Sequence, residues 1–163
     1  MRYARIDYPE AVNGLGFGVS LFTQGCRFHC KNCFNSELWN YDGGNLWTKE
    51  NENEIIGLLN QSGIARLSIL GGEPLSPENI DDLTSLLKRV KKELPNKRIW
   101  LYSGFEYDKI DLELIKYVDV LVDGKFVEEL KDYTLKFRGS KNQRLVNVQK
   151  SLQANKIILW EER

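Results

Sequence analysis

Short apolar, β-prone runs alternate with stretches of helical periodicity along most of this chain. The β-prone runs cover residues 18–23, 66–70, 98–102 and 118–122, and the helical stretches cover 49–61, 76–93 and 107–116. Strands separated by helices of this length form right-handed βαβ units, in which neighbouring strands run parallel. The pattern therefore predicts an α/β fold built on a parallel sheet. The last forty residues are less regular, with weaker strand patterns at 144–148 and 156–160.

Chemically distinctive residues follow directly after each of the four main predicted strands. In chain order they are a cysteine-rich loop at 25–34, a turn at 71–74, and the pairs 103–104 and 123–124. Parallel strands have their carboxyl ends at one edge, and ligands bind at that edge in parallel α/β sheets and barrels. The sequence therefore predicts a single site to which all four segments contribute.

The cysteines give this site its chemistry. All three lie within eight positions, at Cys26, Cys30 and Cys33, and they cannot all pair as disulfides with one another. Three thiolates on one loop can instead ligate a metal centre. A four-iron iron–sulfur cluster normally takes four cysteines, so three of them would leave one iron with an open position. The triplet therefore favours a catalytic [4Fe-4S] cluster over structural stapling.

Two other interpretations of the cysteines have to be considered. Free cysteine is a common core residue, but polar residues such as Arg27 and Lys31 separate these three and argue against burial. The second is a structural zinc site completed by His29. His29 is adjacent to Cys30, however, and neighbouring residues rarely both reach one tetrahedral ion. A zinc-stabilised binding module remains the alternative outside the enzymes.

Charge and hydropathy exclude several classes of function. Lys plus Arg and Asp plus Glu each total 23, and this neutral balance argues against a general nucleic-acid binder. The amino terminus has no apolar run of signal-peptide length, and no stretch approaches the roughly 20 apolar residues of a membrane helix. An odd number of cysteines without a signal peptide indicates a reducing compartment. We expect one cytoplasmic domain over residues 1–163, with no nucleic-acid or membrane partner.

Two motifs resemble those of the radical S-adenosylmethionine (radical SAM) superfamily. One is the spacing Cys-x3-Cys-x2-Cys after a first strand. The other is Gly-Gly-Glu-Pro at 71–74, although a glycine pair before proline is by itself typical of a tight turn. The resemblance implies an incomplete parallel (β/α) barrel of radical SAM type. It also implies that Cys26, Cys30 and Cys33 hold a [4Fe-4S] cluster whose open iron binds S-adenosylmethionine (SAM).

The same resemblance implies a set of residues around SAM. These residues are Asn32, Cys33, Phe34, Gly71, Gly72, Glu73, Ser103 and Asp123. Backbone groups near Asn32 and Gly72 are expected to contact SAM, and Ser103 and Asp123 are candidates for its carboxylate or ribose. One position departs from the superfamily pattern, because Asn32 stands where an aromatic residue usually precedes the third cysteine. This departure weakens a side-chain stacking role there.

Further segments resemble one family within the superfamily. They cover residues 12–16, 25–35, 70–75, 99–104, 118–126 and 138–144, and in this order they are similar to the activating proteins of anaerobic (class III) ribonucleoside-triphosphate reductases. The resemblance implies an enzyme that cleaves SAM reductively. The resulting 5′-deoxyadenosyl radical would take a hydrogen atom from a glycine on the large reductase subunit. It also implies a cytosolic one-electron donor such as flavodoxin.

Two alternatives stay open among the enzymes. One is an activase of another glycyl-radical enzyme, and the other is a radical SAM enzyme acting on a small molecule. Activases differ mainly in the rim that faces the partner protein, and the sequence of that rim alone does not identify the partner. Residues 138–144 carry no obvious catalytic chemistry, and we expect them to contribute to fold closure or partner docking.

Overall fold

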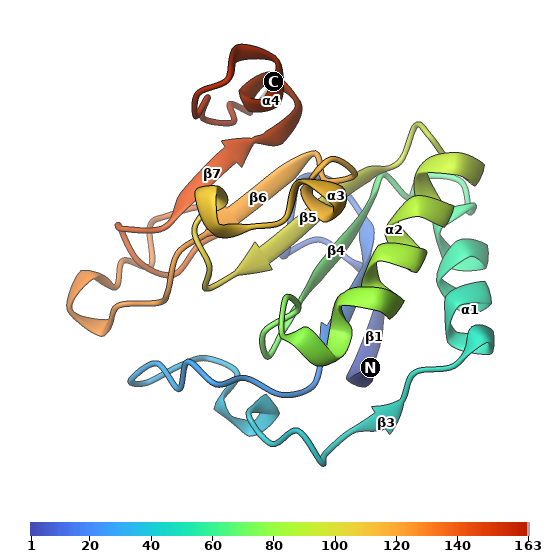
Figure 1. The fold of residues 1–163 in the computed structure, drawn as a ribbon, viewed down its shortest axis with the longest axis horizontal. Helices are drawn as coiled ribbons and strands as arrows, with labels where there is room; N and C mark the ends of the chain where they lie inside the picture. Colours follow the sequence, from blue (N-terminus) through green and yellow to red (C-terminus); the bar gives the residue numbers. More distant parts are fainter. Residues whose placement is uncertain (163) are drawn as a thin grey trace.

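The computed structural model describes residues 1–162 and has an α/β fold with one seven-stranded sheet (Figure 1). Its strands are β1 (Arg2–Glu10), β2 (Gly18–Thr23), β3 (Asn45–Leu46), β4 (Arg66–Gly71), β5 (Arg98–Ser103), β6 (Val120–Asp123) and β7 (Arg144–Asn147). They lie in the order β3-β1-β2-β4-β5-β6-β7, and the sheet does not close into a barrel. The α/β class predicted from the sequence is confirmed.

The centre of the sheet is parallel and its flanks are antiparallel. Strands β2, β4, β5 and β6 run parallel to one another, whereas β1, β3 and β7 pair antiparallel with their neighbours. The expectation of a wholly parallel sheet is therefore corrected to a mixed one. Strand β7 is antiparallel to β6 because the residues that connect them, 124–143, return to the same sheet edge without a crossover helix. We call residues 124–143 the β6–β7 excursion.

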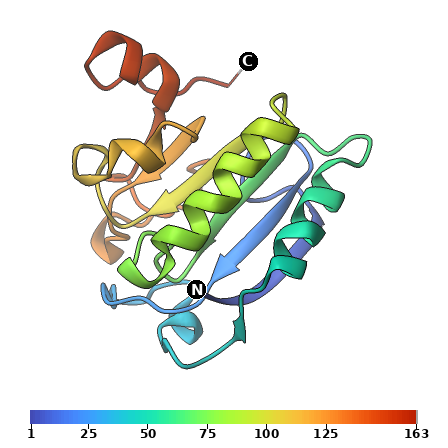
Figure 2. The same ribbon diagram turned by 45° about the vertical axis from the view of Figure 1, so that its right-hand side comes forward.

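The helices are α1 (Lys49–Leu59), α2 (Ile80–Glu93), α3 (Leu112–Ile115) and α4 (Val148–Ala154). Figure 2 shows α1 and α2 side by side across one face of the sheet. Their buried leucines and isoleucines pack on side chains of the central strands such as Leu21, Ile69 and Leu101. None of the helices in the described part of the chain is long and apolar enough to span a membrane.

Several predicted element boundaries change in the structure. The stretch 76–93 begins with a 3-10 turn, Pro77–Asn79, and Ser76 makes no side-chain cap. The stretch 107–116 splits into a 3-10 turn at Tyr107–Lys109 and the short helix α3. The backbone of Ile110 is extended between them, and Asp111 then caps α3 by accepting a hydrogen bond from the Glu113 amide.

Two terminal features were predicted wrongly or missed. The weak strand pattern at 156–160 is not a strand and forms only an isolated bridge between Val146 and Leu159. Strand β1 was missed because its partly exposed residues do not alternate regularly between apolar and polar. Its backbone still pairs with β2 along most of its length, and that pairing extends the sheet beyond its parallel centre.

The second face of the sheet is polar at the amino end of β4 and apolar at the carboxyl ends of β4, β5 and β6. At the amino end, Arg66 is fully buried and its guanidinium pairs with Glu10 at 2.6 Å and donates to Ser68 Oγ at 2.7 Å. Gly14 leaves room for this side chain, since a Cβ there would lie 2.5 Å from Arg66 Nε. At the carboxyl end, Leu70, Tyr102 and Val122 line an open cavity instead.

Candidate functional site

A cavity of about 430 Å³ lies at the carboxyl ends of the parallel strands. Its walls come from the cysteine loop after β2, the turn at the end of β4, Ser103 and Gly104 at the end of β5, and the β6–β7 excursion. Figure 1 shows the blue cysteine loop and the orange excursion on either side of the ends of these strands. The structure therefore brings the four predicted segments together at one edge of the sheet.

All three cysteines line this cavity as free, partly buried thiols. The Cys26 amide donates to the carbonyl of Trp39 at 3.1 Å, and the Cys33 amide donates to the carbonyl of Cys30 at 3.1 Å. The backbone amide of Asn35 donates to Cys33 Sγ at 3.4 Å. Burial raises the pKa of the Cys26 and Cys30 thiols above the ordinary value.

The arrangement of the thiols suits a cluster better than a single ion. Within residues 1–162, no group of three or more His, Cys, Asp or Glu side chains is arranged to hold one metal ion. The ring of His29 stacks on Trp39 at 4.4 Å, away from a role as fourth ligand. A [4Fe-4S] cluster binds each cysteine through a different iron, so its ligands surround it instead of converging on a point. Three thiols bordering one cavity fit that requirement.

The glycine pair brings the turn after β4 against the cysteine loop. Gly71 has a φ of +121°, and a Cβ there would lie 2.5 Å from the Thr23 amide nitrogen. The Gly72 amide donates to the Thr23 carbonyl at 3.0 Å, and the Glu73 amide donates to the Gly25 carbonyl at 2.7 Å. The side-chain amide of Asn35 adds a bond to the Gly71 carbonyl. Because the two backbones approach so closely, glycine is required at positions 71 and 72 by the fold itself, before any ligand binds.

Glu73 is buried and ties the end of β4 to the end of β5. Its carboxylate accepts hydrogen bonds from the Leu75 amide at 2.9 Å, the Ser103 hydroxyl at 2.8 Å and the Gly104 amide at 2.7 Å. Burial raises the pKa of this carboxyl, and the three hydrogen bonds oppose that rise. The carboxylate thus holds the cavity wall, and its oxygens are engaged by the protein itself.

Ser103 and Asp123 have different surroundings. Ser103 lines the cavity, although its hydroxyl is already bonded to Glu73 and to the Phe105 amide. Asp123 is buried and is not among the lining residues. It accepts two hydrogen bonds from Arg144, at 3.0 and 2.6 Å, and so joins β6 to β7. A direct contact between Asp123 and SAM stays a prediction.

The structure gives a reason for the unusual asparagine. Asn32 has a φ of +56°, in the left-handed region, where asparagine is tolerated far better than bulky side chains. Its side chain is exposed, and it is not among the lining residues, whereas its neighbours Cys33 and Phe34 are. A stacking aromatic is therefore replaced by a residue that suits the turn.

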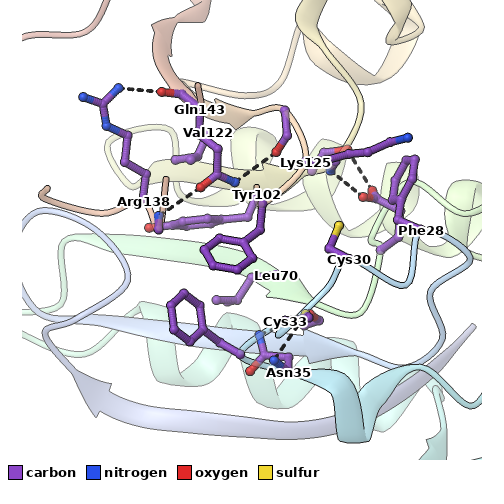
Figure 3. Close-up of a pocket in the computed structure, with 18 of the residues that line it drawn as sticks. Phe28, Cys30, Cys33, Asn35, Leu70, Tyr102, Val122, Lys125, Arg138 and Gln143 are labelled. Carbon is purple, nitrogen blue, oxygen red and sulfur yellow. Dashed lines mark hydrogen bonds between the residues drawn. The ribbon is translucent and has the colours of Figure 1, made fainter. Parts of the chain in front are cut away.

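Residues 138–144 fasten the base of the β6–β7 excursion. The Gln143 side chain donates to the Gly124 carbonyl at 2.9 Å and accepts from the Gly139 amide at 2.9 Å. Asn142 donates to the Lys125 carbonyl at 2.8 Å. Figure 3 shows Arg138 and Gln143 on the side of the cavity opposite Cys30. Residues 138–144 therefore contribute to fold closure, which is one of the two roles expected for them.

Several lining residues carry no recognisable motif. Leu70, Tyr102 and Val122 form an apolar floor, and burial raises the pKa of the Tyr102 phenol. Lys125 and Phe126 approach the cysteine loop, with the Lys125 ammonium 4.9 Å from the Phe28 ring centre. The two-residue periodicity of the strands was the one available signal, because it places residues 70, 102 and 122 on the face away from the helices.

Comparison with known proteins adds an independent finding. Residues 12–146 match the sequence model of the family described as the 4Fe-4S single cluster domain. The chain is 44% identical over 142 residues to the anaerobic ribonucleoside-triphosphate reductase-activating protein of Vibrio cholerae, covering 83% of this chain and 92% of that one. The proteins of the same description from Enterobacteria phage T4 and Salmonella typhi are 42% and 40% identical, covering 89% and 88% of this chain and 93% and 96% of theirs.

Proposed function

The chain belongs to the family of anaerobic ribonucleoside-triphosphate reductase-activating proteins, and from this premise we propose how its cavity performs the activation. It is an iron–sulfur activating enzyme whose cofactors are a [4Fe-4S] cluster and SAM. The observation that carries the proposal is that three cysteines and the Gly-Gly-Glu turn line one cavity. A bound, reduced cluster supplies the electron that cleaves SAM to methionine and the 5′-deoxyadenosyl radical.

The thiols of Cys26, Cys30 and Cys33 hold the cluster in this proposal, and no fourth cysteine exists to fill its open iron. The backbone from 32 to 34 and at Gly72 binds SAM, with Gly71 and Glu73 as support. Ser103 is the candidate for a polar contact with SAM from the cavity wall. The Glu73 carboxylate contributes by holding that wall, because its hydrogen bonds connect two strand ends.

The surrounding fold is proposed to be an incomplete radical SAM barrel formed by a single domain over residues 1–163. The four parallel strands β2, β4, β5 and β6 support this, since they carry the cavity at their carboxyl ends. The antiparallel strands at both sides leave the sheet open.

The partner in this proposal is the large subunit of the anaerobic reductase, from which the radical takes a glycine hydrogen. Exposed apolar side chains at the cavity support a protein substrate: Val12, Phe34 and Tyr133 are 77%, 57% and 80% exposed and all line it. They come from three separate segments of the chain. Exposed apolar groups gathered in this way mark interaction sites.

We propose a cytoplasmic setting with a flavodoxin-like electron donor.

The test is anaerobic reconstitution with iron and sulfide, followed by reduction in the presence of SAM. We expect about four irons per chain, release of 5′-deoxyadenosine, and a glycyl radical signal by electron paramagnetic resonance when the anaerobic reductase is added. Cys30→Ala should abolish all three. Tight zinc binding without iron-dependent SAM cleavage would instead support a zinc-stabilised module. SAM cleavage with a radical only on another glycyl-radical enzyme would reassign the partner.

A further inference from the structure

The phenol of Tyr102 brings a hydroxyl to the cavity floor that has no hydrogen-bond partner within residues 1–162. Tyr102 lies on β5 opposite Val122 of β6, and Leu70 of β4 lies on its other side (Figure 3). Burial raises the pKa of the phenol. The hydroxyl therefore stays protonated at neutral pH and can donate one hydrogen bond.

This hydroxyl is open to the cavity. The buried polar atoms that lack a partner in the described part of the chain do not include it, which means that water can reach it. The side chain leaves the sheet on the face away from α1 and α2, where it packs beside Val122 and lines the cavity. A ligand in the cavity can therefore accept a hydrogen bond from Tyr102 without breaking a bond inside the protein.

Other polar side chains of the cavity wall are already engaged by the protein. The Ser103 hydroxyl donates to Glu73 and accepts from the Phe105 amide. The carboxylate of Glu73 accepts three hydrogen bonds. The side-chain amide of Gln143 donates and accepts within the β6–β7 excursion. The hydroxyl of Tyr102 thus has a free donor, which Ser103, Glu73 and Gln143 do not offer.

The surroundings of this hydroxyl suit the adenosine part of SAM. Leu70, Val122 and Phe137 line the cavity on the same side of the sheet as Tyr102. Charged groups are costly among apolar side chains, so the amino-acid part of SAM fits this floor poorly. Adenosine combines apolar ring faces with a few oxygen and nitrogen acceptors. Small-molecule sites commonly pair apolar walls with a few polar groups that fix the orientation of the ligand.

We propose that the Tyr102 hydroxyl donates a hydrogen bond to an oxygen or nitrogen atom of the adenosine part of SAM and thereby orients SAM in the cavity; this rests on the function proposed above. The hydroxyl is the one polar group of the Tyr102 side chain, so its removal isolates this single contact. Loss of one neutral hydrogen bond should weaken SAM binding about fivefold, which corresponds to about 1 kcal/mol.

The test is Tyr102→Phe in the reconstituted protein, because phenylalanine keeps the ring on the cavity floor and lacks the hydroxyl. Equilibrium dialysis with the oxidised cluster measures SAM binding without SAM cleavage. We expect unchanged iron content and an about fivefold higher Kd for SAM. The matched control is Tyr107→Phe, since burial also raises the pKa of that phenol but Tyr107 does not line the cavity. It should leave the Kd unchanged.

A second ligand identifies the part of SAM that is contacted. 5′-Methylthioadenosine has the adenosine without the amino-acid part, and its Kd should rise by the same factor in Tyr102→Phe. A rise for SAM alone would overturn the adenosine contact, and an unchanged Kd for SAM would overturn any contact. Both results would leave the activase function intact as long as the wild-type protein cleaves SAM. If the wild-type protein assembles no cluster, the proposed function fails first, so the two failures are distinguishable.

Discussion

The hydroxyl of Ser103 donates a hydrogen bond to the carboxylate of Glu73 at 2.8 Å, across the carboxyl ends of β5 and β4. Both residues are buried, and the same carboxylate also accepts from the Gly104 amide. A single side chain thus fixes the spacing of two strand ends where they form the cavity wall. The carboxylate of Glu73 therefore has a structural role at the site, in addition to any contact with SAM.

Replacing Glu73 by glutamine should therefore weaken both the fold and the site. The carboxamide has nearly the same shape, but its NH2 group would face one of the N–H groups that now donate a hydrogen bond to the carboxylate. We expect a loss of about 1–3 kcal/mol in the free energy of unfolding and a decline in SAM cleavage. Urea unfolding and 5′-deoxyadenosine release measure the two effects. Glu113→Gln, at an exposed position in α3, is the control and should change neither.

Gly72→Ala tests the close approach of the turn to the cysteine loop. An added Cβ would overlap the carbonyl oxygen of Gly25, so one of the two backbones must shift. We expect a destabilisation of about 1–3 kcal/mol, as for other overpacked sites, and poor cluster assembly. Iron content after reconstitution and urea unfolding provide the measurements.

Gly57→Ala is the opposite control. Gly57 lies in α1 with no neighbouring atoms where a Cβ would stand. Alanine is the better helix former there, and it should stabilise the protein by about 0.5–1 kcal/mol without affecting cluster assembly. A Gly72 variant as stable as the Gly57 variant would show that the turn can move away from Gly25 freely.

The sequence predicted the parallel centre of the fold because its β-prone runs alternate with helical stretches, and such βαβ units pair their strands in parallel. It also placed the cysteines, the glycine turn and Ser103 at one edge, since parallel strands share their carboxyl ends. Strand β1 was missed because its sequence is half-exposed and charged. The role of β1 depends on backbone pairing with β2, which side-chain periodicity does not reveal.

The unpredicted part of the site consists of residues whose function depends on contacts across the chain. Tyr102 is an ordinary strand residue until the alternation of β5 directs it into the cavity. Asp123 has a motif-like position at the end of β6, yet its carboxylate accepts hydrogen bonds from Arg144, 21 residues later. Trp39 carries no motif at all, and it lines the cavity through a segment whose backbone pairs with Cys26.

Gln143→Ala should loosen the β6–β7 excursion. The side chain accepts from the Gly139 and Ser140 amides and donates to the Gly124 carbonyl, and alanine leaves all three groups without their partner. We expect faster limited proteolysis within 124–143 and roughly 1–3 kcal/mol lower stability. Gln153→Ala, at an exposed site in α4, should leave the cleavage rate unchanged. Equal protection of both variants would mean that other contacts hold the excursion.

The ion pair between the partly buried Glu10 and the fully buried Arg66 should make stability depend on pH. Partial burial raises the pKa of Glu10, but hydrogen bonds from Arg66, Ser20 and nearby amides together bring that pKa below the ordinary value of 4.5. A depressed carboxyl pKa means that the unfolded chain binds the proton more readily. The pair therefore contributes its full stability above about pH 4.5, and this contribution is lost as pH falls through the folded pKa.

Glu10→Gln tests this dependence, because it leaves the fully buried Arg66 without its countercharge. Breaking a buried pair costs about 3–5 kcal/mol, so we expect a large drop in stability at neutral pH and a smaller further decrease on acidification. Urea unfolding followed by tryptophan fluorescence, repeated across about pH 3 to 7, measures both. Asp7→Asn removes an exposed carboxylate from the same strand and should preserve the wild-type profile. A Glu10→Gln profile parallel to that of the wild type would show that the acid sensitivity arises elsewhere.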